Sequence, residues 1–489
     1  MQTVRCISSL HSSTTTTRAW KNLCAAFLLF AAGTAAPAQT KFTSLFSFDG
    51  TNGANPHYVY LVQGTDGKLY GTAYTSTGSG GTIFKITTAG ALTTIYTFCP
   101  EGEACVDGAQ PYAGLVLATN GDFYGTAANG GANSFGTVFQ VTSAGKLTAL
   151  HSFDSTDGAS PEVALIQATN GELYGTTSIG GSTDVGTIFD ITTAGKFTSL
   201  LNFTGTNGDY PDGKLVQGTD GNFYGTTEEV SSGSGTVFKM TPAGKLTTLH
   251  KFTGSGSDGA GPTSALFQAS NGNFYGTTQA GGTHGDGTVF QITSAGKLTT
   301  LYSFCAKSEC TDGANPSAGL IQATDGNLYG TTFSGGSNET ACNGGCGTIF
   351  KITTSGTLTT LYNFCSESGC VDGSQPQEGL VQHTNGTLYG TTYYGGSDGL
   401  GTIYSLSVGL GPFVETVPTS GKASAKVIIL GTSLTGATSV SFNGTAATFK
   451  VVSSSEITTT VPTGATTGTV TVKTPSGTLS SNVAFVVSD

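Results

Sequence analysis

Hydrophobic and polar residues follow a recurring pattern of short strand-like runs, and these runs come in sets of four. The clearest copy runs from Gly319 to Phe364. Runs rich in Thr, Ile, Leu, Phe and Tyr that are separated by glycine-containing turns predict β-strands. We expect strands at 319–324, 327–332, 347–353 and 358–364, with a tight hairpin at Asp325-Gly326.

The second strand of each copy carries the motif Leu-Tyr-Gly-Thr-Thr or a close variant. Its tyrosine recurs every 50 to 60 residues, as Tyr70, Tyr124, Tyr174, Tyr224, Tyr275, Tyr329 and Tyr389. A period of about 50 residues built from four strands is typical of β-propeller blades. The motif changes little between copies, and its glycine and threonines suit closely packed sheets, so we expect it to serve packing.

Strand counting predicts how the repeats close. The third strand occurs seven times, from Gly81-Thr82 to Gly401-Thr402, but the last copy has no fourth strand of its own. A matching strand at 42–48 precedes the first complete copy. We therefore expect 42–48 to pair antiparallel with 401–405 and to close a seven-bladed β-propeller over residues 39–408, an all-β fold without free edges.

The composition changes after this array. Residues 412–489 are rich in Val, Thr and Ser, lack the tyrosine motif, and contain about seven short strand-like runs, which predict an immunoglobulin-like β-sandwich. The stretches VIILGT (427–432), VSFNGT (440–445) and GTVTV (468–472) resemble those of IPT/TIG domains. That resemblance implies an immunoglobulin-like module of the kind found in surface and exported proteins.

The first 38 residues predict a signal peptide. A basic start ends at Arg18 and Lys21, an apolar stretch covers 23–33, and Ala36-Pro37-Ala38 offers a cleavage pattern. We expect an exported monomer in the extracellular space, at the cell surface or in the periplasm, without a transmembrane segment after cleavage. Cleavage would change the formal net charge from −11 to −14. Such an acidic chain lacks the electrostatic footprint for nucleic acid or anionic membranes.

Eight cysteines follow this segment as four close pairs. The pairs are Cys99 and Cys105, Cys305 and Cys310, Cys342 and Cys346, and Cys365 and Cys370. Local pairs in an exported chain predict four short disulfides. Metal binding is the alternative, but CNGGC (342–346) has no histidine partners at ligand spacing, so we expect no metal there.

The repeat also resembles a known family. DGxLYGTT, the Gly-Gly loop and GTIFKIT-xxGxLTxLYxF extend over residues 42–406 and resemble the GloVer tandem repeats of bacterial exported proteins, the choice-of-anchor tandem repeat GloVer-containing proteins. The resemblance implies an exported bacterial protein of unestablished biochemical activity. Family members carry varied C-terminal sorting signals; neither an apolar tail nor LPxTG precedes Asp489, so the sequence leaves anchoring open.

Two variable positions of the repeat are candidates for ligand contact. In a propeller, the loops from fourth to first strand and from second to third strand emerge on one face, which usually carries function. The residue after the proline of the first loop type is His57, Tyr112, Glu162, Asp212, Thr263, Ser317 or Gln377. The residue two places after the first threonine of the tyrosine motif is Tyr74, Ala128, Ser178, Glu228, Gln279, Phe333 or Tyr393.

Aromatic residues at and beside these positions favour binding. The aromatic candidates are His57, Tyr58, Tyr74, Tyr112, Phe333, Tyr393 and Tyr394. Most of them fall in blades six, seven and one, where we expect a crescent of rings that stacks on a glycan, a cell-wall polymer or a protein partner. The simpler alternative is that these aromatics only pack within the fold.

Glu162 and Asp212 complete the candidate set. Two carboxylates on adjacent blades can serve glycoside hydrolysis, but no Ser-His-Asp order, zinc-spaced histidines or phosphate loop accompanies them. We therefore expect a non-catalytic binding protein without a cofactor, and a secreted carbohydrate-active enzyme (hydrolase or lyase) at the channel mouth is the alternative. Each DG loop has a single aspartate, which is too few oxygen ligands for a calcium site. Calcium is nevertheless the metal that these loops could bind. We expect His151 and His250 at the surface.

Overall fold

A computed structural model describes residues 40–488 of the chain, except 58, 101–103, 230–232 and 339–340. The predicted signal peptide and Tyr58 lie outside the described residues. Regular structure in the described part is almost entirely β-strand; its 3-10 helices are η1 (Ser308–Cys310) and η2 (Ser368–Cys370). Among the described residues, no helix is long and apolar enough to cross a membrane.

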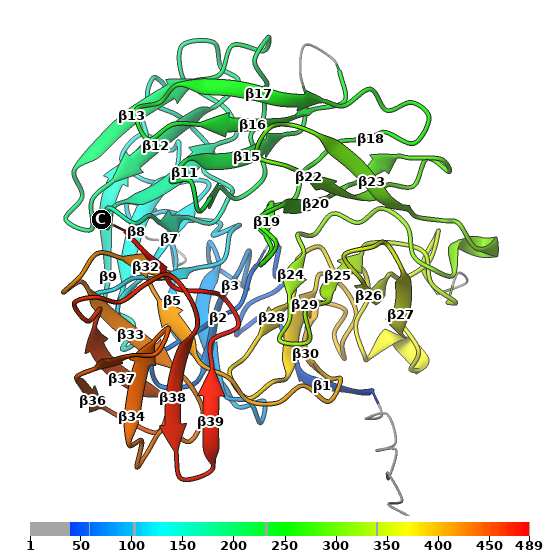
Figure 1. Cartoon of the computed structure of the whole chain (residues 1–489). Coiled ribbons are helices and arrows are strands. Elements are labelled where there is room, and N and C mark those ends of the chain that lie inside the picture. Colours follow the sequence, from blue (N-terminus) through cyan, green and yellow to red (C-terminus); the bar gives the residue numbers. More distant parts are fainter. Residues whose placement is uncertain (1–39, 58, 101–103, 230–232, 339–340, 489) are drawn as a thin grey trace, which may run out of the picture. The chain divides into compact units, whose positions relative to one another are not determined.

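Seven four-stranded antiparallel sheets follow one another within the described residues (Figure 1). The first strands are β2 (Val62–Gln63), β6 (Val116–Leu117), β10 (Ile166–Gln167), β14 (Val216–Gln217), β19 (Phe267–Gln268), β24 (Ile321–Gln322) and β28 (Val381–Gln382). The second strands are β3 (Leu69–Ala73), β7 (Phe123–Ala127), β11 (Leu173–Thr177), β15 (Phe223–Thr227), β20 (Phe274–Thr278), β25 (Leu328–Thr332) and β29 (Leu388–Thr392). We number the repeats one to seven by these second strands.

The outer strands complete each sheet. The third strands are β4 (Thr82–Ile86), β8 (Thr137–Val141), β12 (Thr187–Ile191), β16 (Thr236–Met240), β22 (Thr288–Ile292), β26 (Thr348–Ile352) and β30 (Thr402–Ser407). The fourth strands of repeats one to six are β5 (Leu92–Thr97), β9 (Leu147–Ser152), β13 (Phe197–Asn202), β17 (Leu246–Lys251), β23 (Leu298–Ser303) and β27 (Leu358–Asn363). Repeat five adds the short pair β18 (Gly259–Ala260) and β21 (Ala280–Gly281).

Repeat seven takes its fourth strand from the start of the chain. Strand β1 (Lys41–Ser47) pairs antiparallel with β30, so that Lys41 lies opposite Ser407 and Ser47 opposite Thr402 (Figure 1). The sheet order is β1-β30-β29-β28. The pairing that strand counting predicts is therefore confirmed.

The tyrosine motif packs as expected. In repeat six all five of its residues are buried. A side chain at Gly330 would meet the Phe350 ring of the adjacent strand at 2.7 Å, so only glycine fits there. Tyr329 donates its hydroxyl hydrogen to Asp325 of the hairpin turn over 2.9 Å. The constant residues of the repeat thus hold a sheet together and leave recognition to the variable positions.

Neighbouring sheets meet through the loop that enters each repeat. Pro111 packs on Gly81 of repeat one, where an added Cβ would lie 2.7 Å from the proline ring. Pro56 makes the corresponding contact with Gly401, at 2.8 Å. Repeat seven therefore contacts repeat one as the other repeats contact their successors.

The C-terminal residues form two further four-stranded sheets. One has the order β31 (Glu415–Val417), β33 (Lys426–Leu430), β37 (Glu456–Thr460) and β36 (Phe449–Val451). The other has the order β35 (Thr445–Ala447), β34 (Ser439–Phe442), β38 (Val470–Thr474) and β39 (Gly477–Ser480), and β32 (Ser420–Gly421) pairs with β40 (Val486–Val487). Residues from both sheets, among them Ile429 and Val472, share one apolar core, as in a β-sandwich. These strands outnumber the seven expected because several are only two or three residues long.

The C-terminal sheets contact the repeats at an exceptional position. A glutamine on the first strand usually accepts a hydrogen bond from the turn of the preceding repeat, as Gln63 does from the backbone N–H of Thr384 over 2.9 Å. Repeat two has Leu117 instead, and Ile428 and Leu430 of β33 belong to the same buried cluster as Leu117. The substitution replaces a polar link between repeats with an apolar contact for the C-terminal sheets.

Candidate functional site

The two variable positions lie on the face formed by the loops from fourth to first strand and from second to third strand. We call the residues after the loop prolines the mouth positions: His57, Tyr112, Glu162, Asp212, Thr263, Ser317 and Gln377. We call the residues that follow the second strands the outer positions: Tyr74, Ala128, Ser178, Glu228, Gln279, Phe333 and Tyr393.

A shared backbone conformation fixes these positions. The residue before each loop proline has positive φ, for example 57° at Gln110 and 51° at Tyr210. Its carbonyl accepts a hydrogen bond from the outer residue of the same repeat, as Tyr210 does from the N–H of Glu228 over 2.9 Å. Each outer side chain can then reach the mouth residue of the following repeat.

Aromatic side chains of repeats seven, one and two meet around His57. The ring centre of His57 lies 4.8 Å from that of Tyr112, 5.0 Å from Tyr393 and 6.1 Å from Tyr74. Tyr74 and Tyr112 are 4.4 Å apart, as are Tyr393 and Tyr394. We call these five residues the aromatic cluster. Its rings are half-buried except that of Tyr394, which is 44% exposed.

The cluster differs from the predicted crescent by one repeat. The crescent was expected over repeats six, seven and one, whereas the rings meet over repeats seven, one and two. The reason is the offset between positions: Tyr74 meets Tyr112 of the following repeat. By the same offset the successor of Phe333 is Gln377, which is not aromatic, and no ring contact within the described residues joins Phe333 to the cluster. Tyr58, the remaining candidate, lies outside the described residues.

The two predicted carboxylates converge on one serine. Ser178 donates its hydroxyl hydrogen to Asp212 over 3.0 Å, and the same hydroxyl is a hydrogen-bonding neighbour of Glu162. Burial raises the pKa of Asp212 well above its ordinary value, and the nearby Glu228 and Glu162 raise it further. Burial likewise raises the pKa of Glu162, against the effect of the serine hydroxyl. We call Glu162, Asp212 and Glu228 the acidic cluster.

The aromatic and acidic clusters adjoin. Burial chiefly raises the pKa of Tyr112, and both Tyr74 and Glu162 act on it in the same direction, so Tyr112 is the member of the aromatic cluster that faces the acidic cluster. Beside them lies a shallow depression with a cavity volume of only about 20 Å³. Its lining includes the mouth residues Glu162, Asp212 and Thr263. A ligand on this face can therefore touch rings and carboxylates together.

The floor of the depression holds residues that the sequence interpretation missed: Tyr60, Lys214 and Glu378. The Lys214 ammonium lies 5.8 Å from the centre of the Tyr60 ring. Burial lowers the pKa of Lys214, while Glu378 and Glu415 oppose this shift. Burial raises the pKa of Glu378 to about 7. These buried residues, whose charges partly compensate one another, therefore line the depression together with Glu162 and Asp212.

A sequence signal for this floor exists. A leucine directly precedes each first strand, and the residue before that leucine is small in five repeats: Gly114, Ala164, Ala265, Gly319 and Gly379. Repeats one and four have Tyr60 and Lys214 there, and repeat one has one extra residue between Pro56 and Leu61. A large side chain among small ones at a shared inner position marks the floor.

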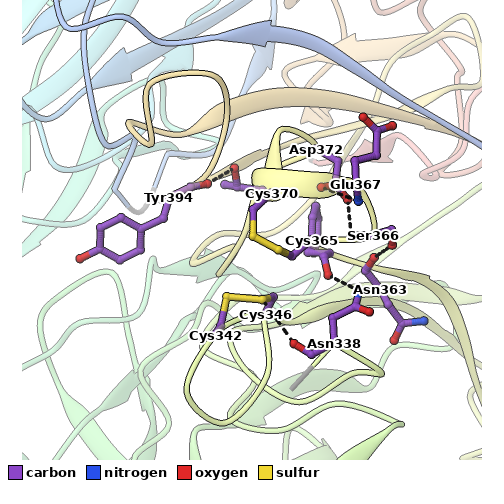
Figure 2. Close-up of a disulfide and its surroundings, with 12 residues drawn as sticks. Asn338, Cys342, Cys346, Asn363, Cys365, Ser366, Glu367, Cys370, Asp372 and Tyr394 are labelled. Carbon is purple, nitrogen blue, oxygen red and sulfur yellow. Dashed lines mark hydrogen bonds between the residues drawn. A yellow bond between two sulfur atoms is a disulfide. The ribbon is translucent and has the colours of Figure 1, made fainter. Parts of the chain in front are cut away.

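All four predicted disulfides are present. They join Cys99 to Cys105, Cys305 to Cys310, Cys342 to Cys346, and Cys365 to Cys370. The last two lie side by side, and the Tyr394 ring points away from them (Figure 2). The carbonyl of Cys370 accepts a hydrogen bond from Gly396 over 2.9 Å, which ties this disulfide loop to the segment that carries Tyr394. Bonded sulfurs offer no thiolate to a metal ion.

The aspartates of the DG loops serve the fold. Tyr302 donates its hydroxyl hydrogen to Asp312 over 2.7 Å. His151 takes the place of this tyrosine in repeat two, and its Nε2 lies 2.8 Å from the Asp157 carboxylate. His250 makes the corresponding contact in repeat four. Both histidines thus replace a hydrogen-bonding tyrosine, and their side chains are partly exposed, at 20% and 26%.

The comparisons with known proteins establish the family. Residues 102–269 and 230–450 match the model of the Gloeobacter/Verrucomicrobia repeat. The chain belongs to this family. The matched segments together span more than half of the chain and agree with the GloVer resemblance of its motifs. No curated protein matches this repeat protein.

Solved structures resemble this member of the Gloeobacter/Verrucomicrobia repeat family only distantly. A fungal alcohol oxidase of the AA5 family, in complex with copper, is 12% identical, with 92% of this chain and 99% of that chain covered and a TM-score of 0.49. A putative 6-phosphogluconolactonase from Bacteroides uniformis is 18% identical, with 66% and 88% covered and a TM-score of 0.45. A putative gluconolactonase is 13% identical, with 77% and 94% covered and a TM-score of 0.38. These likenesses carry no argument about activity.

Proposed function

We propose that this repeat protein is an exported, non-catalytic binding protein whose mouth face holds a glycan or cell-wall polymer. The aromatic cluster carries the proposal. Five rings from three repeats meet beside a depression, and Tyr394 is 44% exposed to solvent. Tyrosine offers a large, rigid contact surface at low entropic cost and a hydroxyl for hydrogen bonds, which suits a sugar ring.

The fold we propose is a closed seven-bladed β-propeller followed by an IPT/TIG-type module. Pairing of β1 with β30 and the contact of Pro56 with Gly401 support closure. The sandwich at residues 412–488 supports an immunoglobulin-like module that acts as a spacer or a second adhesive surface. The protein would act as a monomer, and binding of this kind needs no metal or cofactor.

Export is supported by the covalent chemistry of the chain. Four disulfides are stable in an oxidising compartment and rare in a reducing cytosol. They also reinforce loops of the mouth face, where a rigid site loses less entropy on binding. The predicted signal peptide at residues 1–38 belongs to the same proposal.

Binding to polysaccharides tests this function. Residues 39–489 would be incubated with insoluble cellulose, chitin, xylan and peptidoglycan, and the bound fraction measured. We expect retention on at least one polymer, and its loss in the double variant Tyr112→Ala/Tyr393→Ala. Phe333→Ala is the matched control, since it removes a ring at an outer position away from the cluster. Retention of the double variant at the wild-type level would reject the site.

A carbohydrate-active enzyme is the second candidate, favoured by the acidic cluster. Glu162 and Asp212 share the Ser178 hydroxyl, and burial raises the pKa of both, as a general acid requires. The test is release of reducing ends from the same polymers. Activity that Asp212→Asn abolishes would favour the enzyme, whereas binding without release would favour the non-catalytic role.

A further inference from the structure

The acidic cluster lies next to the aromatic cluster, and within the described part of the chain no ion pair joins its carboxylates to a lysine. Lys214 is the basic residue nearest in sequence, two places after Asp212. Its electrostatic partners are Glu378 and Glu415, and its ammonium lies over the Tyr60 ring. Among the described residues, the interactions that shift Asp212 and Glu162 involve carboxylates and Ser178 but no lysine.

A cationic ligand would reduce the electrostatic repulsion among the carboxylates of the acidic cluster. Three carboxyl groups repel one another when ionised, and burial strengthens the repulsion because water screens it less. The Ser178 hydroxyl gives Asp212 a single hydrogen bond over 3.0 Å, which orients the carboxyl but supplies no charge. An ammonium group placed among the carboxylates would supply both charge and hydrogen-bond donors.

The aromatic cluster favours the same ligand charge. Ring faces of tyrosine attract cations through their quadrupole. Burial lowers the pKa of His57 to about 4, so its ring is neutral near pH 7 and does not repel a cation. Tyr112 adjoins both clusters, so a pyranose ring stacked on it would place its substituents near Glu162.

From this juxtaposition we propose that the mouth face selects a glycan with free amino groups. The sugar ring stacks on the aromatic cluster while an ammonium substituent pairs with Glu162, Asp212 and Glu228. This inference rests on the proposed glycan-binding function and narrows its ligand class. A lysine-rich peptide would satisfy the carboxylates as well, but the half-buried rings beside them favour a flat saccharide surface.

Titration calorimetry with two matched probes tests the inference. The probes are a β-1,4-linked glucosamine hexamer and its fully N-acetylated counterpart, measured at pH 6 with residues 39–489. We expect at least tenfold tighter binding of the free-amine hexamer, and a smaller difference in 0.5 M NaCl. Asp212→Asn/Glu228→Gln should remove this preference for the free-amine hexamer. If the double variant does not fold, Glu162→Gln provides the test. It leaves two carboxylates and should reduce the affinity ratio of the two hexamers at least twofold.

The outcomes separate the two proposals. Equal binding of both hexamers, or a preference that survives the carboxamide substitutions, would overturn the amino-group inference and leave glycan binding in place. Binding of neither hexamer, with a hexalysine peptide bound tightly, would overturn the glycan assignment itself. Glucosamine binding that exceeds hexalysine binding and depends on both clusters would support the whole proposal.

Discussion

Closure by β1 can be tested with one side chain. Phe42 on β1 stacks on Tyr362 of repeat six with ring centres 3.8 Å apart, and it also contacts Phe364 and Tyr404 at 5.9 and 5.3 Å. Truncation of a fully buried phenylalanine to alanine costs about 3–5 kcal/mol. Phe42 is only half-buried, so we expect Phe42→Ala to lower the free energy of unfolding by about 2 kcal/mol.

An internal repeat supplies the matched control. Phe197 occupies the same place in β13, where the sequence KFTSLLN parallels KFTSLFS of β1, and its ring stacks on His151 at 3.9 Å. If β1 is a true fourth strand, Phe197→Ala and Phe42→Ala should have similar costs. Urea unfolding followed by circular dichroism would measure both. An unchanged unfolding free energy for Phe42→Ala, beside a clear loss for Phe197→Ala, would refute closure by β1.

Three further predictions concern buried charge and the disulfides. Burial raises the pKa of Glu378 to about 7 from 4.5, so its contribution to stability is present below pH 4.5 and lost as pH rises through 7. In urea unfolding, the free energy of unfolding of Glu378→Gln should therefore rise by about 3 kcal/mol relative to that of the wild type between pH 4.5 and 7.5. A difference between the two proteins that does not change with pH would contradict this. The pKa of His57 is lowered to about 4 from 6.5, so its contribution is present above pH 6.5 and lost as pH falls toward 4. As pH falls from 6.5 to 4, the free energy of unfolding of His57→Phe should rise relative to that of the wild type by up to about 3 kcal/mol in the same urea experiment. A relative rise at high pH would contradict a lowered pKa of His57. Replacing both Cys365 and Cys370 by serine should weaken polysaccharide retention more than the same change at the Cys99–Cys105 bridge, because only the former supports the Tyr394 segment; equal effects would argue against that role.

Much of the fold follows from local sequence. Strand positions depend on short-range alternation and on turns such as Asp325-Gly326, and the missing fourth strand of repeat seven can be counted directly. The disulfides were predictable because each joins cysteines at most six residues apart. These features need no knowledge of how repeats are placed against one another.

The site was harder to predict because it depends on contacts between repeats. The variable positions were identified, but the offset that brings Tyr74 to Tyr112, and places Gln377 rather than a ring after Phe333, is a property of the packed array. Glu378 looks like an ordinary surface residue in the sequence, and Lys214 differs from its counterparts only by its size, yet both line the depression. Sequence periodicity alone does not predict which side chains from different repeats converge.

The most direct test of the central claim is the affinity of a soluble oligosaccharide from the retained polymer for three proteins: wild type, Tyr112→Ala/Tyr393→Ala and Phe333→Ala. Loss of two central rings should cost about 3 kcal/mol, or roughly 100-fold in dissociation constant. We expect that loss in the double variant and a change within twofold in Phe333→Ala. Equal affinities for the wild type and the double variant, or a large loss confined to Phe333→Ala, would contradict binding at the aromatic cluster.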